Sequence, residues 1–447
     1  MAKYQSYAEY KDSGVEWLGN VPQHWALVPC RAVVDHIVEK NSNNALDNYL
    51  SLMANIGVIK YEDKGDVGNK KPDDLSKCKI VRKGQLVINS MNYAIGSYGM
   101  SPYDGICSPV YIVLQAKKDV FLERFALRIF ENTPFQKYLA TFGNGILEHR
   151  AAINWEDIKN KYVPLPTLDE QKNILDFLDH ETSKIDRLIE KQQQLIELLK
   201  EKRQAVISHA VTKGLYPNVP MKDSGVEWLG EVPEHWVVKS YRLASRIYRG
   251  KFGHRPRNDP AFYDGDYPFI QTGDVARAGK YITSYSQTLN EKGKEVSQLF
   301  PKGTLMMAIA ANIGDIAILG FEAYAPDSVV GFKPNNDIDL EFLRYSFIAA
   351  LPALEQTSTQ STQANLNVER IGAVKGTFPS LQEQREIVGY LDNLLEQYRN
   401  LVKIAENAIS LMQERRTALI SAAVTGKIDV RHWQAPTVAE ADTEFSA

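Results

Sequence analysis

The 447-residue sequence contains little cysteine and no long apolar run. Its three cysteines, Cys30, Cys78 and Cys107, form no C-x-x-C pair, which argues against a zinc site or a disulfide framework. No stretch of about 18 apolar residues occurs, and the first residues lack the apolar core of a signal peptide. We therefore expect a cytoplasmic protein that does not associate with a membrane.

The sequence also lacks the motifs of enzymes that act on nucleotides or DNA. It has no G-x-x-x-x-G-K-[ST] loop for ATP, and no H-E-x-x-H or G-x-S-x-G motif. The segment 142–145 (FGNG) has the wrong spacing for a methyltransferase glycine turn, and 258–263 (NDPAFY) lacks the second proline of an adenine methyltransferase motif. We expect this chain to have no catalytic residue and to bind neither a metal nor a cofactor.

The composition is that of a globular protein, with 44% hydrophobic and 24% charged residues. The length exceeds that of one ordinary domain, so two or more hydrophobic cores are expected. The formal net charge of −3 differs from the basic balance of most DNA-binding proteins. The local distribution of basic residues therefore matters more than their sum.

The chain repeats one plan. Residues 11–25 (KDSGVEWLGNVPQHW) recur at 222–236 (KDSGVEWLGEVPEHW) with two differences. Residues 168–171 (LDEQ) and 206–212 (VISHAVT) recur as 381–384 (LQEQ) and 419–425 (LISAAVT). A repeat of this kind fixes the architecture, which here is a short segment, a variable region and a long helix, followed by the same series again.

The two variable regions share a skeleton although their sequences differ. Lys83-Gly84-x-Leu86 in the first region corresponds to Lys302-Gly303-x-Leu305 in the second. Short β-like runs occur at 86–88, 110–114, 267–270 and 305–309, and helices are expected near 121–140 and 339–355. The pattern predicts two α+β domains of the same fold.

These observations predict seven segments. They are an N-terminal repeated segment (1–25), a first recognition domain (26–163), a first helix (164–215), the second repeated segment (216–236), a second recognition domain (237–378), a second helix (379–431) and a disordered tail (432–447).

The two helices carry an apolar seam at the 4-3-4-3 spacing of a coiled coil. Such seams cannot stay in water, so the two in this chain are expected to pack together. Polar residues at seam positions 192, 202 and 415 either fix the register or extend to the surface. The seam comprises Leu178, Ile185, Leu188, Leu195, Leu199 and Val206 in the first helix, and Leu391, Leu394, Leu401, Met412 and Leu419 in the second.

The repeat also predicts the relative direction of the two long helices. Equivalent units that pack through equivalent faces are related by a two-fold axis, which gives antiparallel helices if the axis crosses them. A parallel pair is the alternative. By the same symmetry, residues 11–25 are expected to dock beside 424–431, because 222–236 follows the end of the first helix.

Basic residues cluster in both variable regions, where they are candidates for contacts with phosphates and base edges. A solvated charged surface is the alternative. The second region contributes Arg246, Arg249, Lys251, His254, Arg255, Arg257 and Thr272, and the first contributes Lys77, Lys79, Arg82, Lys83, Asn89, Asn92 and Tyr93. Polar loops before each helix add His149, Arg150, Gln360, Thr362, Gln363 and Asn365. His24 and His235, within the repeated P-x-H-W, are instead expected to be hydrogen-bonded in a packed turn.

The repeated order of variable domain and helix resembles the specificity subunit of type I restriction-modification enzymes. Residues 248–251 (YRGK) and 267–275 (YPFIQTGDV) are similar to the opening of a target-recognition domain, and 362–366 (TQANL) to the loop near its end. The pattern P-x-L-x-E-Q-x-x-I occurs at 166–174 and 379–387. The first domain lacks an Arg-Gly-Lys opening, so its contacts are less defined.

The resemblance implies an α+β fold in which two pseudo-two-fold-related target-recognition domains are separated by two long helices packed as an antiparallel coiled coil. Each domain would read one half of a split, asymmetric site in double-stranded DNA, and the helices would set the gap. Two modification (methyltransferase) subunits would dock on the helices, bind S-adenosylmethionine and methylate adenine. Restriction subunits would translocate and cut the DNA.

Two other functions remain open from the residues alone. A scaffold protein would use the seam for assembly and the variable domains for protein ligands, and salt-dependent DNA binding would argue against it. An enzyme fragment with an unrecognised site would transfer methyl groups on its own.

Overall fold

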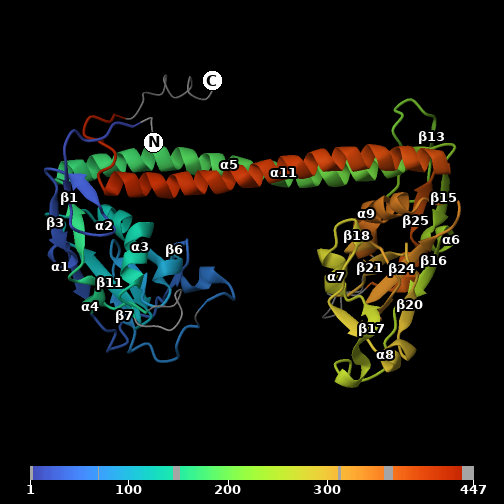
Figure 1. Cartoon of the computed structure of the whole chain (residues 1–447), viewed down its shortest axis with the longest axis horizontal. Helices are drawn as coiled ribbons and strands as arrows, with labels where there is room; N and C mark the ends of the chain where they lie inside the picture. Colours follow the sequence, from blue (N-terminus) through green and yellow to red (C-terminus); the bar gives the residue numbers. More distant parts are fainter. Residues whose placement is uncertain (1–3, 69, 144–151, 311–313, 357–365, 435–447) are drawn as a thin grey trace. The chain divides into compact units, whose positions relative to one another are not determined.

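The computed structural model describes residues 4–68, 70–143, 152–310, 314–356 and 366–434. Contacts divide the chain into two compact units, a first unit of Met1–Gln192 with Asn407–Ala447 and a second unit of Gln193–Glu406. The long helices α5 (Leu168–Lys213) and α11 (Leu381–Val424) each run through both units (Figure 1). Each unit therefore contains part of both helices. None of the described helices combines the length and the apolarity needed to cross a membrane.

The first unit is built around an antiparallel sheet of four strands in the order β4-β11-β8-β9. Two short strand pairs, β1-β2 and β12-β3, connect it to the repeated segment and to α5. Its strands are β1 (Tyr10–Asp12), β2 (Asn20–Pro22), β3 (Ala26–Pro29), β4 (Val34–Ile37), β5 (Leu50–Met53), β6 (Gly57–Lys60), β7 (Lys79–Val81), β8 (Leu86–Asn89), β9 (Tyr98–Met100), β10 (Gly105–Cys107), β11 (Tyr111–Ala116) and β12 (Tyr162–Leu165). Its short helices are α1 (Cys30–Val33), η1 (Tyr61–Lys64), η2 (Tyr93–Ile95), α2 (Glu123–Phe130), α3 (Thr133–Ala140) and α4 (Trp155–Ile158).

The second unit repeats this order in β16-β24-β21-β22 and has the equivalent strand pairs β13-β14 and β15-β25. It adds β18, which pairs with β22 in parallel, and a second sheet in the order β19-β17-β23-β20. Its strands are β13 (Met221–Asp223), β14 (Glu231–Pro233), β15 (Val237–Ser240), β16 (Ser245–Arg249), β17 (Tyr263–Phe269), β18 (Tyr281–Ile282), β19 (Gln287–Leu289), β20 (Gln298–Phe300), β21 (Leu305–Ala308), β22 (Ile316–Leu319), β23 (Ala323–Ala325), β24 (Val329–Pro334) and β25 (Lys375–Phe378). Its short helices are α6 (Tyr241–Ala244), η3 (Pro260–Phe262), α7 (Thr272–Arg277), α8 (Glu291–Glu295), α9 (Leu340–Gln356) and α10 (Val368–Ala373). The prediction of two α+β domains of one fold is confirmed.

The predicted single helix near 121–140 is wrong, because the structure forms two helices there. Helix α2 ends at Phe130 and α3 begins at Thr133. Pro134 occupies the first turn of α3, and in a continuous helix its ring would clash with the carbonyl of Phe130. The predicted helix near 339–355 is confirmed as α9.

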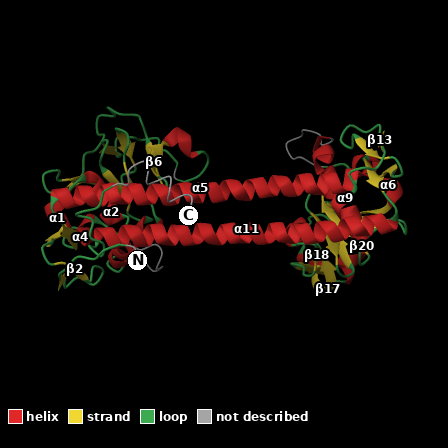
Figure 2. Cartoon of the chain, turned by 90° about the horizontal axis from the view of Figure 1, so that it is seen from above, coloured by secondary structure: helices red, strands yellow, loops and turns green. Residues whose placement is uncertain are grey.

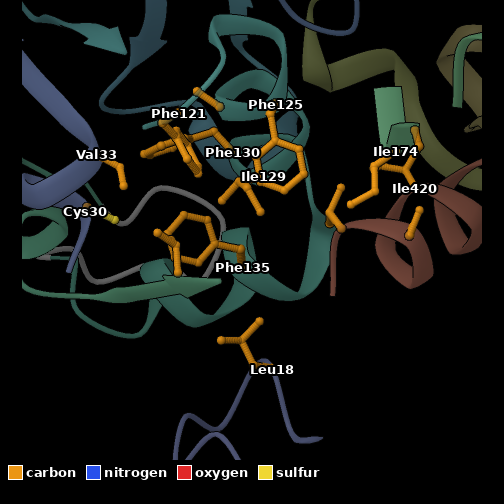
Figure 3. Packing of buried hydrophobic residues seen from close by; sticks show 14 of the residues in the cluster. Leu18, Cys30, Val33, Phe121, Phe125, Ile129, Phe130, Phe135, Ile174 and Ile420 are labelled. Atoms are coloured by element: carbon orange, nitrogen blue, oxygen red, sulfur yellow. The ribbon is translucent and has the colours of Figure 1, made fainter. Parts of the chain in front are cut away.

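Both long helices contribute to the core of the first unit. Figure 3 shows Phe125, Ile129 and Phe135 packed near Ile174 of α5 and Ile420 of α11. All five side chains are buried. Since burial of one such side chain stabilises a fold by about 1.5–3 kcal/mol, this core also holds the two helices together.

In each unit the beginning of one long helix lies beside the end of the other (Figure 2). In the first unit, Leu178 of α5 belongs to the same core as Leu419 of α11. In the second, Ile207 of α5 belongs to the same core as Leu391 of α11. The helices are therefore antiparallel, as the two-fold argument predicted.

The same set of contacts connects the two long helices in each unit, and we call it the helix joint. It consists of the glutamate three residues after the helix N-cap, the tryptophan of the repeated segment and the glycine that ends the other helix. In the first unit, Glu170 Oε1 accepts hydrogen bonds from Trp25 Nε1 at 3.2 Å and from His24 Nε2 at 2.8 Å. Gly426 lies against the same tryptophan, with a φ of +73° that favours glycine at a helix C-terminus.

The second joint has the same contacts. Glu383 accepts from Trp236 Nε1 at 3.1 Å and from His235 Nε2 at 3.0 Å, and Gly214 (φ +80°) lies against Trp236. The predicted packed turn with a hydrogen-bonded imidazole is confirmed for His24 and His235. Thr167 and Ser380 cap the two helices, in the T/S-x-x-E pattern of a capping box.

The N-terminal segment docks where the repeat predicted. Tyr10 Oη donates to the carbonyl of Gly426 at 3.1 Å, and Lys427 Nζ donates to the carbonyl of Asn20. The amide of Asp429 donates to the carbonyl of Gln5 at 2.8 Å. The prediction that residues 11–25 lie beside 424–431 is confirmed.

The seam is buried only in part. Leu178, Ile185, Leu199, Leu391 and Leu419 are buried, and Val206, Leu394 and Met412 are half-buried. The expectation that the two seams bury against each other is not met at Leu188, Leu195 and Leu401, which are 41%, 41% and 46% exposed. Seam positions Gln192, Ala405 and Ala408 offer little apolar surface, which limits how much of the seam this chain can cover by itself.

We predict that Glu170→Ala destabilises the first unit by about 1.5–3 kcal/mol, because the substitution leaves the buried Trp25 Nε1 without an acceptor. The exposed neighbour Asp169 provides the control, and Asp169→Ala should change stability by less than about 1 kcal/mol. Urea unfolding followed by tryptophan fluorescence measures both. Equal effects of the two substitutions would contradict the role of the joint.

Candidate nucleic-acid interface

In the second unit, the predicted basic cluster lies on β16 and on the loop after it. Arg246 and Arg249 are on the strand, and Lys251, Arg255 and Arg257 are on the loop. All five side chains are exposed. They form a continuous basic stretch of chain that solvent can reach.

Carboxylates neutralise part of this cluster. Asp327 pairs with Arg257 at 2.6 Å and with Arg255 at 3.6 Å, and Glu369 pairs with Arg249 at 3.2 Å. Exposed ion pairs of this kind contribute at most about 1 kcal/mol, so a phosphate can compete for the guanidinium groups. Neither Lys251 nor Arg246 forms an ion pair within the described residues, and these two charges are therefore the most available of the cluster.

His254 and Thr272 have structural surroundings. The His254 ring stacks on Phe262 at 4.0 Å, and its Nε2 lies 3.0 Å from Asp259 Oδ2. Thr272 begins α7 and is half-buried. Neither side chain is as exposed as the arginines of the cluster.

A cavity of about 290 Å³ adjoins the cluster and contains residues that were not predicted from the sequence. Phe252 and Tyr263 form apolar parts of its lining, while Asn258, Gln271 and Gln287 supply amides. The side chain of Gln271 donates to Gln287 Oε1 at 3.0 Å. Gln271 lies within the segment 267–275 that carried the family resemblance, and that was the only signal for it in the sequence.

Gly250 is required for a close backbone contact within the second unit. A Cβ at this position would lie 1.9 Å from the carbonyl oxygen of Pro326 and 2.4 Å from that of Val329. The loop thus leaves β16 in direct backbone contact with the turn before β24. This contact places Lys251 at the start of the exposed loop.

In the first unit, the smaller basic cluster surrounds β7 and the turn after it. Arg82 pairs with Glu39 through two contacts of 2.8 and 2.9 Å, and Lys77 lies 3.8 Å from Asp74. Lys79 is half-buried and donates to the carbonyl of Tyr111 at 2.5 Å. Lys83 is exposed. Three basic side chains therefore reach solvent here.

The structure corrects two residues of this cluster. Tyr93 is 3% exposed, and its hydroxyl donates to the carbonyl of Phe130, so the side chain belongs to the core and is not available to DNA. Asn89 is also buried, and its Oδ1 accepts from the amide of Met91 at 3.1 Å, so the predicted contact with DNA is wrong for this residue too. It lines a cavity of about 150 Å³ together with Asn92. Tyr93 was predicted to be a surface residue because asparagine side chains surround it in the sequence. In the structure it begins the short helix η2, and its side chain packs into the core.

The remaining candidates, His149, Arg150, Gln360, Thr362, Gln363 and Asn365, lie outside the described residues. Within the described part of the chain, no group of three or more His, Cys, Asp or Glu side chains is arranged to hold a metal ion.

Comparison with known proteins identifies proteins that share this fold. The model of the type I restriction modification DNA specificity domain matches residues 36–198 and 252–408. The EcoKI type I restriction enzyme specificity subunit of Escherichia coli is 21% identical over 93% of this chain and 92% of its own length. Two solved structures share the fold at 16% identity and cover 91% of this chain. One, from a study of complex assembly in a type I restriction-modification system, has a TM-score of 0.68 over 99% of its chain. The other, the HsdS subunit of Thermoanaerobacter tengcongensis, has a TM-score of 0.51 over 98%.

We predict that Gly250→Ala destabilises the second unit by about 1–3 kcal/mol, because the added methyl group overlaps the Pro326 carbonyl. Gly253→Ala is the matched control, since the nearest atom to its Cβ would lie at 3.6 Å. Thermal unfolding of the full chain compares them. Should both variants melt with the wild type, the contact between the loop and β24 is not formed in solution.

Proposed function

We propose that this chain, which belongs to the family of type I restriction-modification DNA specificity subunits, reads double-stranded DNA with two domains that each recognise one half of a bipartite, asymmetric site. The observation that carries the proposal is the pair of family matches, each of which falls on one copy of the same α+β fold. Two copies with one topology and different loops suit a site whose halves differ in sequence.

The exposed basic residues of each copy are the proposed contacts. In the second copy these are Arg246, Arg249, Lys251, Arg255 and Arg257. Lysine meets phosphate as a point charge, and arginine can also pair bidentately with guanine. The amides around the adjoining cavity suit adenine edges.

In the first copy, Lys77, Arg82, Lys83 and Asn92 take the corresponding role. They are fewer, and Asn92 is only half-exposed. The first domain would therefore rely less on charge than the second.

The chain itself is proposed to be non-catalytic. Two methyltransferase subunits would bind S-adenosylmethionine and methylate adenine, and restriction subunits would join the complex in the cytoplasm. Partner subunits that grip the phosphate backbone would also reconcile DNA binding with a net charge of −3 on this chain.

Exposed leucines on the long helices support two equivalent docking surfaces for the methyltransferase subunits. In the first unit, Leu188 of α5 and Leu411 of α11 are 41% and 65% exposed. Their counterparts in the second unit, Leu401 of α11 and Leu198 of α5, are 46% and 60% exposed. Large apolar side chains in water favour burial against a partner. Because the same positions are exposed in both helices, two copies of one subunit fit them.

We predict that Lys251→Ala, in the complex with the methyltransferase, reduces the slope of log K against log salt by about 0.9, since one phosphate contact is lost. Lys375→Ala, an exposed lysine on β25 outside the basic cluster, should leave the slope unchanged. Fluorescence anisotropy over a salt series measures both. Binding that does not depend on salt would favour a scaffold function.

We also predict that one added helical turn at the equivalent positions after Gln192 and Ala405 widens the gap between half-sites by roughly one to two base pairs. A turn of helix spans about 5.4 Å, and DNA rises about 3.4 Å per pair. Long-read mapping of adenine methylation in cells gives the gap directly. An unchanged gap would mean that the helices do not set it.

A further inference from the structure

The second unit contains a cavity of about 600 Å³ between α9 and the two long helices. Basic side chains from three helices and one loop line it, namely Lys200 and Arg203 of α5, Lys280, Arg344 of α9 and Arg399 of α11. The acidic residues of its lining are Asp315 and Asp392. The excess of positive charge calls for an explanation, because like charges gathered around one cavity disfavour one another.

Arg344 is the most unusual of these residues. It is 9% exposed, and its Nε has no hydrogen-bond partner among the described residues. No ion pair to its guanidinium occurs within the same part of the chain, and the ring of Tyr345 lies 5.4 Å from its Cζ. Burial lowers the pKa of Arg344, and the charge of Arg203 lowers it further, although Asp392 and Glu341 act in the opposite direction. A buried guanidinium in this state is unfavourable unless an anion joins it.

The nearby carboxylates are engaged elsewhere. Asp392 accepts from Lys280 at 2.7 Å and from the Tyr345 hydroxyl at 2.5 Å, and Glu341 accepts from Lys280 at 2.5 Å. Burial raises the pKa of Asp315, and this carboxyl forms no ion pair with Arg203 or Arg344 within the described residues. Across the residues that the structure describes, Arg203 and Arg344 are thus left without a carboxylate partner.

The outer basic residues are partly neutralised. Lys200 pairs with Glu197 at 2.8 Å, and Arg399 lies 4.0 Å from Glu396. Both pairs are exposed and therefore weak. They leave Lys200 and Arg399 able to add to the positive charge at the mouth of the cavity.

The equivalent region of the first unit, around α2 and the two long helices, allows the lining of this cavity to be compared between the two copies. Gln171 and Gln384 accept from the amides of Leu122 and Asp339, which makes these two positions equivalent. Five residues later, Leu127 stands where the second copy has Arg344. The cavity there, of about 780 Å³, is lined by Leu127, Gln413 and Arg416.

Charge in that corner is compensated. Arg416, the counterpart of Arg203, pairs with Asp186 at 2.9 Å, and Asp186 is the counterpart of Arg399. The fold therefore does not require a buried arginine or an excess of basic residues at this place. The second copy has acquired both.

We propose that the cavity lined by Arg203 and Arg344 binds a phosphate-type oxyanion. Guanidinium groups offer paired N–H donors that match phosphate oxygens, and no carboxylate among the described residues pairs with these two. The oxyanion is either a backbone phosphate of DNA or a free phosphate, inorganic or on a nucleotide. The free-phosphate case does not depend on the proposed DNA-reading function.

The test uses the full chain in sodium phosphate and in sodium chloride at equal ionic strength and pH. Phosphate should raise the melting temperature of the wild type by roughly 2–4 °C. Arg344→Leu, which installs the residue of the first copy, should abolish this rise without lowering the melting temperature in chloride. Arg203→Ala, at an exposed position, should reduce it, and Arg416→Leu in the first unit should preserve it. No phosphate-specific rise in the wild type, or a full rise in Arg344→Leu, would overturn the proposal.

Binding of duplex DNA by the complex then identifies the source of the oxyanion. If Arg344→Leu also lowers the salt slope of DNA binding by about 0.9, the cavity takes a backbone phosphate. If the slope is unchanged while the phosphate-induced rise is lost, the cavity takes free phosphate. A complex that binds no DNA at all would refute the proposed function and leave the phosphate result standing.

Discussion

A glutamate at the start of each long helix, buried in the first unit and half-buried in the second, accepts hydrogen bonds from a tryptophan and a histidine of the repeated segment. The repeated segment in turn lies against the glycine that ends the other helix. One carboxylate thereby joins three pieces of chain that are distant in sequence. The antiparallel course of α5 and α11 and the docking of the N-terminal segment both depend on this joint.

The internal repeat allowed much of the fold to be predicted from the sequence. Residues 11–25 and 222–236 are nearly identical, so the chain connection at the end of the first helix served as a template for a contact at the end of the second. The hydrogen bond between Tyr10 and Gly426 confirms that contact. Periodicity and β-like runs sufficed for the sheets and for α9. They failed at Pro134, where one proline divided a helix that otherwise showed a continuous pattern.

The candidate interface was less accessible to sequence reasoning. Residue type identified the exposed arginines of β16 and its loop, but it could not show that Asp327 and Glu369 pair with them. It also placed Tyr93 at the surface, although the tyrosine hydroxyl bonds inside the core. Such errors are expected where function rests on loops, because their side-chain directions depend on tertiary contacts rather than on a local period. The exposed leucines of α5 and α11 show a different limit of sequence reasoning. The seam pattern identified apolar positions on these helices, but it could not predict which of them this chain buries and which are left for a partner.

The two copies have kept their joints and sheets and have diverged in loops and in buried charge. The cavity beside α9 illustrates this, because Leu127 in one copy corresponds to Arg344 in the other while Gln171 and Gln384 keep the same hydrogen bond to the residue five positions before each of them. Divergence of this kind on a constant frame suits a protein whose two halves recognise different sequences. It also allows one half to acquire a ligand that the other half lacks.

Exchange of the first variable region, residues 26–163, for that of a relative tests the central claim that each copy reads its own half of the site. The measurement is a long-read map of adenine methylation in cells that express the hybrid with the methyltransferase subunit. We predict that one half of the methylated motif changes while the other half and the gap stay the same. A motif in which both halves change would contradict the claim.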